Sequence, residues 1–475
     1  MKGFVAVLAV LAGIVAADPI TLPIQRAVGQ QHLAKRDGTA AAPVTAWGGD
    51  VVYTVKLDVG TPPQSFDFIL DSTNNIIGLL EAPCATCPPG NPLFDSKKST
   101  SWTAAPNNSL SGFGDLGTDV VALVNQSTKF GIGLINTLNT GFPIPPGVSV
   151  SGVLGLSPPP NDPKFPTPLL YDLAQKWTNK VYGIQLQRTR ATVNDTVFSS
   201  QHVGGGSLTL GGVDASVITA SINYTPALNL SGIVGIWAVP LDGINIGGSK
   251  VAAAQATPLI AFPDFSHEGL YAPHDVVAEF YSHVKGAIPI KNGGVQTTWV
   301  FPAGADTIAA DAKGTQSTAN LGLQFTIGGV SYAVADADLA IEVVTADVLT
   351  KNYGASASQA AAAAAWVIGS IQEVDPNAWV PGAPPGISLG NSFLRNVYTA
   401  FQFSPNAVGF GHLKTEAGAP VAPGASGAAG ASGSGASAAS SSAKPTPVPK
   451  SSGAAANRVS VALTLLATVA TVVVA

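Results

Sequence analysis

Two stretches of the sequence follow one pattern. In each, an apolar segment ends in an acidic residue, Asp71 in ILDST and Asp264 in LIAFPDFS. In each, an apolar-apolar-glycine segment follows farther along the chain, GVLGLS at 152–157 and GISLGN at 386–391. The repetition predicts a duplicated chain of two lobes, each presenting one carboxylate at the end of a strand. We expect the two carboxylates to meet where the lobes join.

The body of the chain, about 45–415, is predicted to be mostly β. Short runs of β-forming residues bounded by Gly, Pro and Asn recur along it. They are VVYTVKLDVG, FDFIL, GGSLTLGG, GLQFTIGGVSYAV and VYTAFQF. Helices are predicted at 167–177, at 272–284 and over the alanine run around 357–369, the last from intrinsic propensity alone. A chain of 475 residues with 46% hydrophobic and 11% charged residues is long and apolar enough for large cores.

Charge and cysteine content argue against several functions. The net charge is −5 and the basic residues form no run beyond Lys97-Lys98, so no nucleic-acid partner is expected. The chain has two cysteines, Cys84 and Cys87, and in an oxidising compartment such a close pair most often forms a disulfide. Because there is no second CxxC and no histidine cluster near by, we expect no metal site and no cofactor.

The N-terminal residues carry the pattern of a secreted protein. Residues 1–17 have a positively charged start, an apolar stretch and a small-residue end, which predicts a signal peptide. An uncleaved anchor is the alternative, although the apolar part is shorter than the ~20 residues that a bilayer needs. Residues 18–36 end in the dibasic pair Lys35-Arg36 and are interpreted as a short pro-segment.

The C-terminal residues predict attachment to a membrane. Residues 416–457 are rich in Ser, Ala, Gly and Pro and should form a disordered stalk. Residues 458–475 are an apolar tail, and this order predicts a GPI anchor that places the protein at the cell surface or cell wall. A tail-anchored transmembrane helix is the alternative. Five glycosylation sequons fit an extracellular surface: Asn107, Asn125, Asn194, Asn223 and Asn229.

Several segments, in order, resemble the pepsin-like aspartic peptidases. VYTVKLDVGTPPQSFDFILDSTNN resembles the opening of such a chain, and FDSKKSTSW, GVLGLS, GGSLTLGGVD and SLGNSFLRNVYTAFQFSPNAVGFG follow in the family's order. The resemblance covers about 47–413 and, with the predicted secretion and anchor signals, is similar to fungal surface-anchored members. It implies a mostly β, bilobal fold, with an N-terminal lobe at 45–235 and a C-terminal lobe at 236–415.

The resemblance also implies a chemistry. In the family, two Asp carboxylates share one proton and position a water that attacks a peptide bond, because two like charges so close cannot both ionise. The corresponding residues here are Asp71 and Asp264. The resemblance therefore implies a monomeric acid endopeptidase that acts on peptides or proteins.

The residues after both acids depart from the family pattern. The family has Asp-Thr/Ser-Gly twice, whereas this chain has Asp71-Ser72-Thr73 and Asp264-Phe265-Ser266. Ser72 can supply one of the two hydroxyls that cross-link the lobes, but Phe265 cannot supply the other. Thr73 and Ser266 place a side chain where the family has only hydrogen. These four residues are the predicted active-site support.

Other departures from the family affect the flap segment and the residue that contacts it. The tryptophan that the family places after the first acid corresponds here to Gly78, and the flap segment SLSGFGDLGTDVV has no tyrosine. His267 and Glu268, beside the second acid, are predicted to be solvent-side turn residues. Each acid alone is also compatible with an ordinary turn-forming Asp that accepts from amides two or three residues on.

Three functions remain open from the sequence. The first is the acid endopeptidase at the cell surface. The second is a catalytically silent relative whose interlobe cleft binds a peptide or another ligand. The third is a structural wall-surface protein.

Overall fold

The structure is a computed structural model, and it describes residues 39–47, 50–110, 114–137, 148–161, 166–188, 201–230, 235–256, 258–292, 296–303, 321–374 and 385–414. The predicted signal peptide, pro-segment, stalk, tail and sequon Asn194 lie outside these residues. Within the described ranges, no helix has the length and apolar character needed to cross a bilayer.

Strands dominate the described chain, as predicted. The first half contains β1 (Ala40–Trp47), β2 (Val52–Val59), β3 (Gln64–Asp71), β4 (Ile77–Leu80), β5 (Thr103–Leu110), β6 (Gly114–Leu123), β7 (Gln126–Ile135), β8 (Gly152–Gly155), β9 (Val181–Leu186), β10 (Gln201–Leu210) and β11 (Asn223–Pro226). The second half contains β12 (Val239–Leu241), β13 (Gly243–Ile246), β14 (Ser249–Lys250), β15 (Leu259–Pro263), β16 (Leu270–Ala272), β17 (Ile288–Asn292), β18 (Gln296–Pro302), β19 (Gln324–Ile327), β20 (Val330–Ala333), β21 (Ala340–Thr345), β22 (Ala365–Gly369), β23 (Ile371–Glu373), β24 (Gly386–Leu389), β25 (Val397–Phe403) and β26 (Asn406–His412).

Helices in the described residues are short. They are α1 (Leu169–Ala174), α2 (Ala253–Ala256), α3 (His274–Ser282), α4 (Ala346–Tyr353), α5 (Ala357–Ala360) and α6 (Asn391–Leu394), with 3-10 turns η2 (Ser96–Lys98) and η3 (Asp336–Leu339). The predicted helices at 167–177 and 272–284 are confirmed as α1 and α3.

The helix predicted over the alanine run is mostly wrong. Only α5 forms, one turn capped by Ser356 with Gln359, and the chain then enters strand β22. Trp366 at the start of that strand is buried and its indole N–H donates to the carbonyl of Ala360 at 3.0 Å. Burial of the apolar residues of β22 between β18 and β21 outweighs the helix preference of alanine.

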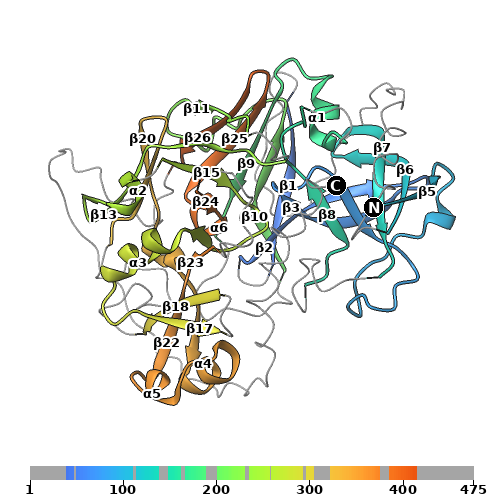
Figure 1. Cartoon of the computed structure of the whole chain (residues 1–475). Helices are drawn as coiled ribbons and strands as arrows, with labels where there is room; N and C mark the ends of the chain where they lie inside the picture. The colour runs from blue at the N-terminus through green and yellow to red at the C-terminus, as the bar shows by residue number, and fades with distance from the viewer. Residues whose placement is uncertain are drawn as a thin grey trace, which may run out of the picture.

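One large sheet contains both the first and the last strand of the described residues. It has 13 strands in the order β11-β26-β25-β9-β10-β1-β2-β3-β8-β4-β7-β6-β5. The C-terminal strands β25 and β26 therefore lie between β9 and β11 of the first half, as Figure 1 shows. The smaller sheets of the second half are β12-β15-β24-β16-β23, β14-β13-β19-β20 and β17-β18-β22-β21. This bilobal, mostly β arrangement is the fold that the sequence predicts.

The predicted duplication is present in the pairing of the strands. In the first half, β3 runs parallel to β8, β8 antiparallel to β4, and β4 parallel to β7. In the second half, β15 runs parallel to β24, β24 antiparallel to β16, and β16 parallel to β23. GVLGLS and GISLGN supply β8 and β24, the corresponding strands of the two units. Each unit therefore delivers its acid at the end of the corresponding strand, β3 or β15.

In each unit, a glycine lets the chain pass close to the backbone of another segment. A Cβ at Gly155 would lie 2.6 Å from the backbone of Asn74 and Ile76, and one at Gly390 would lie 1.9 Å from the carbonyl oxygen of Gly269. Both distances are shorter than any tolerated contact. The glycines of GVLGLS and GISLGN are thus explained by close backbone approach, which lets the strand pass beside the acid-bearing turn.

A buried ion-pair network ties the halves together. Arg395, which follows α6, donates to Asp338 of η3 at 2.9 Å, and both side chains are fully buried. Arg188, which follows β9, also pairs with Asp338, and Arg395 donates to the carbonyl of Asp50 at 3.1 Å. The network therefore joins the β1–β2 turn and the end of β9 to elements of the second half.

Candidate active site

Asp71 lies at the end of β3 with its side chain fully buried. Its Oδ1 accepts hydrogen bonds from the amide of Thr73 at 2.8 Å and from the Thr73 hydroxyl at 2.6 Å. Its Oδ2 accepts a long bond of 3.4 Å from the side-chain amide of Asn74. The turn thus holds one oxygen firmly and the other weakly.

Asp264 follows β15 and is 1% exposed. Its Oδ1 accepts from the amide of Ser266 at 3.1 Å and from the Ser266 hydroxyl at 2.6 Å. Its Oδ2 lies 2.7 Å from Nδ1 of His267 and accepts from the hydroxyl of Ser388 on β24, also at 2.7 Å. These four contacts match the roughly four lone-pair positions of a carboxylate. Asp264 is therefore more fully bonded than Asp71.

Ser72 joins the two acid-bearing turns. Its hydroxyl donates to the carbonyl of Pro263 at 2.7 Å and accepts from the amide of Phe265 at 3.2 Å. Ser72 is completely buried, and so is the Phe265 ring, which packs 6.2 Å from Phe401. The cross-link therefore has the Ser72 half and lacks a hydroxyl from position 265, as the sequence indicates.

The side chains at the family's glycine positions have a role in the hydrogen bonding. Thr73 and Ser266 place a side chain where the family has only hydrogen. Each hydroxyl donates to the acid two residues before it. A small hydroxyl residue is accommodated here because it supplies a donor to a buried carboxylate, which is costly to leave without partners.

The two carboxyl groups have opposite pKa shifts. Burial raises the pKa of Asp71, the hydrogen bonds from Thr73 lower it in part, and the charge of Asp264 raises it further. Burial also opposes ionisation of Asp264, but the charge and hydrogen bond of His267, with the hydroxyls of Ser266 and Ser388, outweigh it. They lower the pKa of Asp264 to about 2. The proton therefore favours Asp71.

The prediction that His267 is a solvent-side residue is wrong. It is 6% exposed, lies against Asp264, and its ring meets the Tyr271 ring edge-on at 5.4 Å. A buried carboxylate needs donors, and the imidazole turns inward to supply one. Its neighbour Glu268 is half-buried.

Ser388 is a site residue that the sequence reasoning missed. The signal was present, because Ser388 is the one polar residue in the otherwise apolar and fully buried strand GISL. A buried hydroxyl within a core strand calls for a partner, which here is Asp264.

The flap segment forms the hairpin of β5 and β6. Its tip at 111–113 lies outside the described residues. Gly78, at the predicted tryptophan position, is buried in β4, and a Cβ on Gly152 of the neighbouring strand β8 would lie 2.2 Å from its carbonyl oxygen. The two strands therefore approach closely at this point.

The predicted disulfide and the glycosylation sequons lie in different environments. Cys84 and Cys87 form a disulfide. Asn229 is exposed, whereas the side-chain amide of Asn223 donates to the carbonyls of residues 327 and 328 at 3.2 Å each. Asn125 is half-buried, and the side chain of Asn107 is not among those described.

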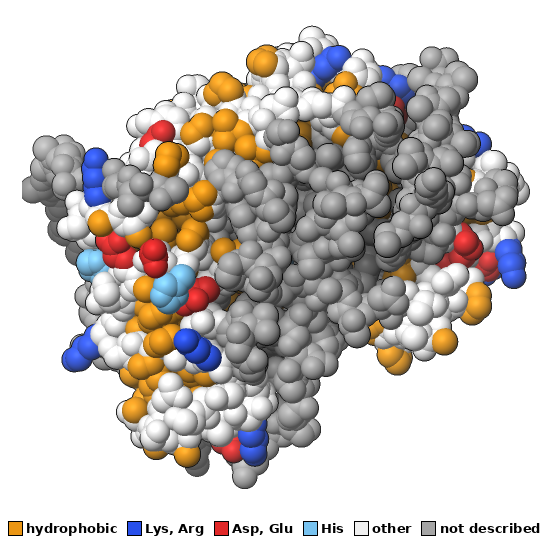
Figure 2. Space-filling model, viewed as in Figure 1, with side chains coloured by type: hydrophobic (Ala, Val, Ile, Leu, Met, Phe, Trp, Pro, Cys, Tyr) orange, Lys and Arg blue, Asp and Glu red, His pale blue; other side chains and the backbone are white. Residues whose placement is uncertain are grey.

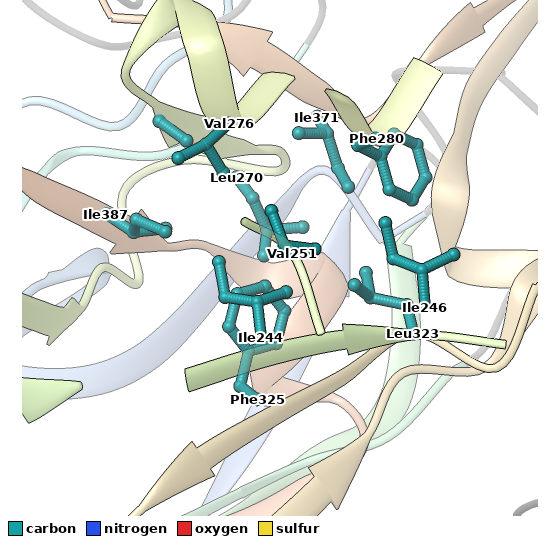
Figure 3. A pocket seen from close by; sticks show the side chains of 11 residues that line it. Ile244, Ile246, Val251, Leu270, Val276, Phe280, Leu323, Phe325, Ile371 and Ile387 are labelled. Carbon is teal, nitrogen blue, oxygen red and sulfur yellow. The ribbon is translucent and has the colours of Figure 1, made fainter. Parts of the chain in front are cut away.

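An apolar void lies away from the acids. It has a volume of about 20 Å³ and is lined by side chains from β13, α3, β19 and neighbouring strands, among them Ile244, Val276 and Phe325 (Figure 3). Its lining contains no ionisable group, so it is a packing defect of the second half and not a candidate substrate site.

In the part of the chain that is described, no group of three or more His, Cys, Asp or Glu side chains is arranged to hold a metal ion. On the face that Figure 2 shows, the Lys and Arg side chains are dispersed and form no basic patch.

Comparison with known proteins agrees with this geometry. The sequence model of the family "Eukaryotic aspartyl protease" matches residues 52–413. "Major aspartyl peptidase 1" of Cryptococcus neoformans var. grubii is 25% identical over 398 residues, which are 80% of this chain and 72% of that protein. "Aspartic-type endopeptidase ctsD" of Aspergillus fumigatus is 22% identical over 417 residues, 86% of this chain and 72% of that protein. "Pepsin A" of Sus scrofa is 23% identical over 368 residues, 76% and 81% of the two chains. Because the family match spans both acid-bearing units, this chain belongs to the eukaryotic aspartyl protease family.

Proposed function

We propose that the chain is an extracellular aspartic endopeptidase that hydrolyses peptide bonds at acidic pH through Asp71 and Asp264. The observation that carries the proposal is the double hydrogen bond of Ser72 to Pro263 and Phe265, which holds the two acid-bearing turns against each other. Support also comes from the pKa of Asp71, which burial raises and the charge of Asp264 raises further.

The different surroundings of the two acids suggest their roles. Ionised Asp264 takes a proton from a water molecule while protonated Asp71 donates its proton to the carbonyl oxygen of the substrate. The water oxygen bonds to the carbonyl carbon and forms a tetrahedral diol. The C–N bond then breaks as the departing nitrogen gains a proton from Asp264 and Asp71 takes one back from the diol. The sum is one water consumed for one peptide bond cleaved.

The proposed extracellular location is supported by sequence patterns in the N-terminal and C-terminal residues. A signal peptide at 1–17, a pro-segment at 18–36 and a GPI signal at 458–475 would deliver a monomer to the cell surface or wall. The disulfide fits an oxidising compartment. The substrate is a peptide or protein.

A second candidate function is a silent homologue that binds a peptide or another ligand in the interlobe cleft. The observation that favours it is the set of four contacts on Asp264. A carboxylate with filled lone pairs and a pKa of about 2 is a weak base, and general-base efficiency falls with the pKa of the base.

Proteolysis by the full-length chain separates the two functions. We expect cleavage of an unfolded protein substrate at about pH 3–5, and loss of cleavage in Asp71→Asn. Asp347→Asn is the matched control, because Asp347 is 68% exposed and pairs with Lys351 on the surface. A wild-type protein that is inert throughout this range refutes the peptidase proposal. If pepstatin or a peptide still raises its Tm, the silent homologue is supported.

A further inference from the structure

The contact between His267 and Asp264 distinguishes the two acids of the site. We propose that His267 is a positioning residue, which holds Asp264 as the ionised member of the pair so that the catalytic proton resides on Asp71. The inference rests on the proposed function and adds to it a fixed division of roles between the two carboxyl groups.

The geometry of the contact supports a proton on the imidazole. Nδ1 of His267 is 2.7 Å from Oδ2 of Asp264, and both side chains are almost fully buried. When Asp264 is ionised its carboxylate can only accept, so the contact then requires a proton on Nδ1. Because solvent is nearly absent around the pair, the attraction is screened far less than in a surface ion pair.

The corresponding position in the first unit holds a different residue. His267 is the third residue after Asp264, and Asn74 is the third after Asp71. The amide of Asn74 also points at an Oδ2, but at 3.4 Å and with no charge to contribute. The duplicated fold thus places a potential cation beside one acid and a neutral donor beside the other.

A second pair of corresponding residues acts in the same direction. Ser388 on β24 pairs with Phe262 on β15, two residues before Asp264, and the Ser388 hydroxyl donates to that acid. Val153 on β8 pairs with Ile69 on β3, two residues before Asp71, and its side chain has no hydrogen-bond donor. Both differences favour the negative charge on Asp264.

Other ionisable groups surround the pair. Among the described residues these are Asp71 from the turn after β3, Glu268 beside His267, Tyr271 on β16 and Arg395 after α6. Burial raises the pKa of Tyr271, and the charges of Asp264 and Glu268 raise it further. Arg395 interacts electrostatically with Glu268, and its guanidinium contacts Asp338. Nδ1 of His267 contacts Asp264 directly, so a charge on His267 affects the ionisation of Asp264 more than that of the other groups.

An exchange between the two units tests the proposal in the full-length chain. His267→Asn gives the second unit the residue of the first and keeps a side-chain donor while removing the charge. We expect the acidic limb of kcat/KM against pH to move up by about 1–3 units, the shift that a neighbouring charge typically produces. The reverse change, Asn74→His, should not reproduce this shift. His274→Asn is the control, because His274 is an exposed histidine outside the site. An unmoved acidic limb in His267→Asn overturns the proposal.

A second measurement does not depend on proteolysis. The chain has six histidines, so nitrogen NMR of labelled histidine can identify His267 by its loss in His267→Asn. At about pH 7, where a free imidazole is mostly neutral, we expect imidazolium at His267 in the wild type and a neutral ring in Asp264→Asn. A neutral ring in the wild type, or no change in the variant, refutes the pairing. If the wild type cleaves nothing but the NMR result holds, the peptidase proposal fails and the pairing stands.

Discussion

Removal of the Ser72 hydroxyl should weaken the junction of the two acid-bearing turns. In Ser72→Ala, the carbonyl of Pro263 and the amide of Phe265 both lose a partner in a region where Ser72 is fully buried. A buried polar group left without its partner costs about 1–3 kcal/mol. Two such groups give an expected loss of about 2–4 kcal/mol in the free energy of unfolding, since the geometry can relax in part.

The matched control is Ser151→Ala. Ser151 is as deeply buried as Ser72, but its hydroxyl has no hydrogen-bond partner within the described residues. Loss of an unpaired buried hydroxyl should be close to neutral. Both variants thus remove a buried serine hydroxyl, but only the hydroxyl of Ser72 has hydrogen-bond partners.

Denaturant and thermal unfolding of both variants provide the assay. Because a chain of this size can unfold in more than one step, midpoints followed by two probes are compared before any free energy is derived. We expect Ser72→Ala to unfold clearly before the wild type and Ser151→Ala to coincide with it. Equal midpoints for the two variants would refute the assignment of Ser72 as the link between the turns.

Three further outcomes are expected. Asp338→Asn leaves the guanidinium of Arg395 buried without its charge partner and should cost about 3–5 kcal/mol in unfolding free energy, whereas Asp347→Asn on the surface should cost less than about 1 kcal/mol. The folded-state pKa of Asp264 lies below its ordinary value of 3.8, so its stabilisation, about 2 kcal/mol, is present above pH 3.8 and lost as the pH falls toward 2; Asp264→Asn should flatten this part of the acid-unfolding curve. Val251→Ile adds a methylene beside the apolar void of about 20 Å³ and should raise the unfolding free energy by about 0.5 kcal/mol; a lower Tm would show that the void cannot accept it.

The duplication of the chain was predictable because both units repeat the same sequence pattern. An apolar run ending at an acid, followed by an apolar-apolar-glycine run, occurs twice, and the structure pairs the two runs in each unit, β3 with β8 and β15 with β24. The glycines at 155 and 390 belong to this pattern for a steric reason, since another strand or turn passes where a Cβ would lie. Each run of the pattern is short and contiguous and is therefore readable in one sequence, although the contact that explains its glycine is non-local.

The details of the site were less predictable. His267 lies in a polar turn, and sequence alone does not show whether the turn faces water or a buried carboxylate. The structure shows the latter. Likewise, the alanine run predicted a helix because propensity is a local property, whereas the strand β22 that replaces it is stabilised by contacts with β18 and β21, whose pairing with it is non-local.

The carboxyl pKa of Asp71, measured in the wild type and in Asp264→Asn by NMR of labelled aspartate, tests most directly whether the two acids form one site. Asp264 raises the pKa of Asp71 through its charge, so the variant should titrate Asp71 at a lower pH than the wild type does. An Asp71 titration that is identical in the two proteins would mean that the carboxyl groups do not interact, and would contradict a shared catalytic proton.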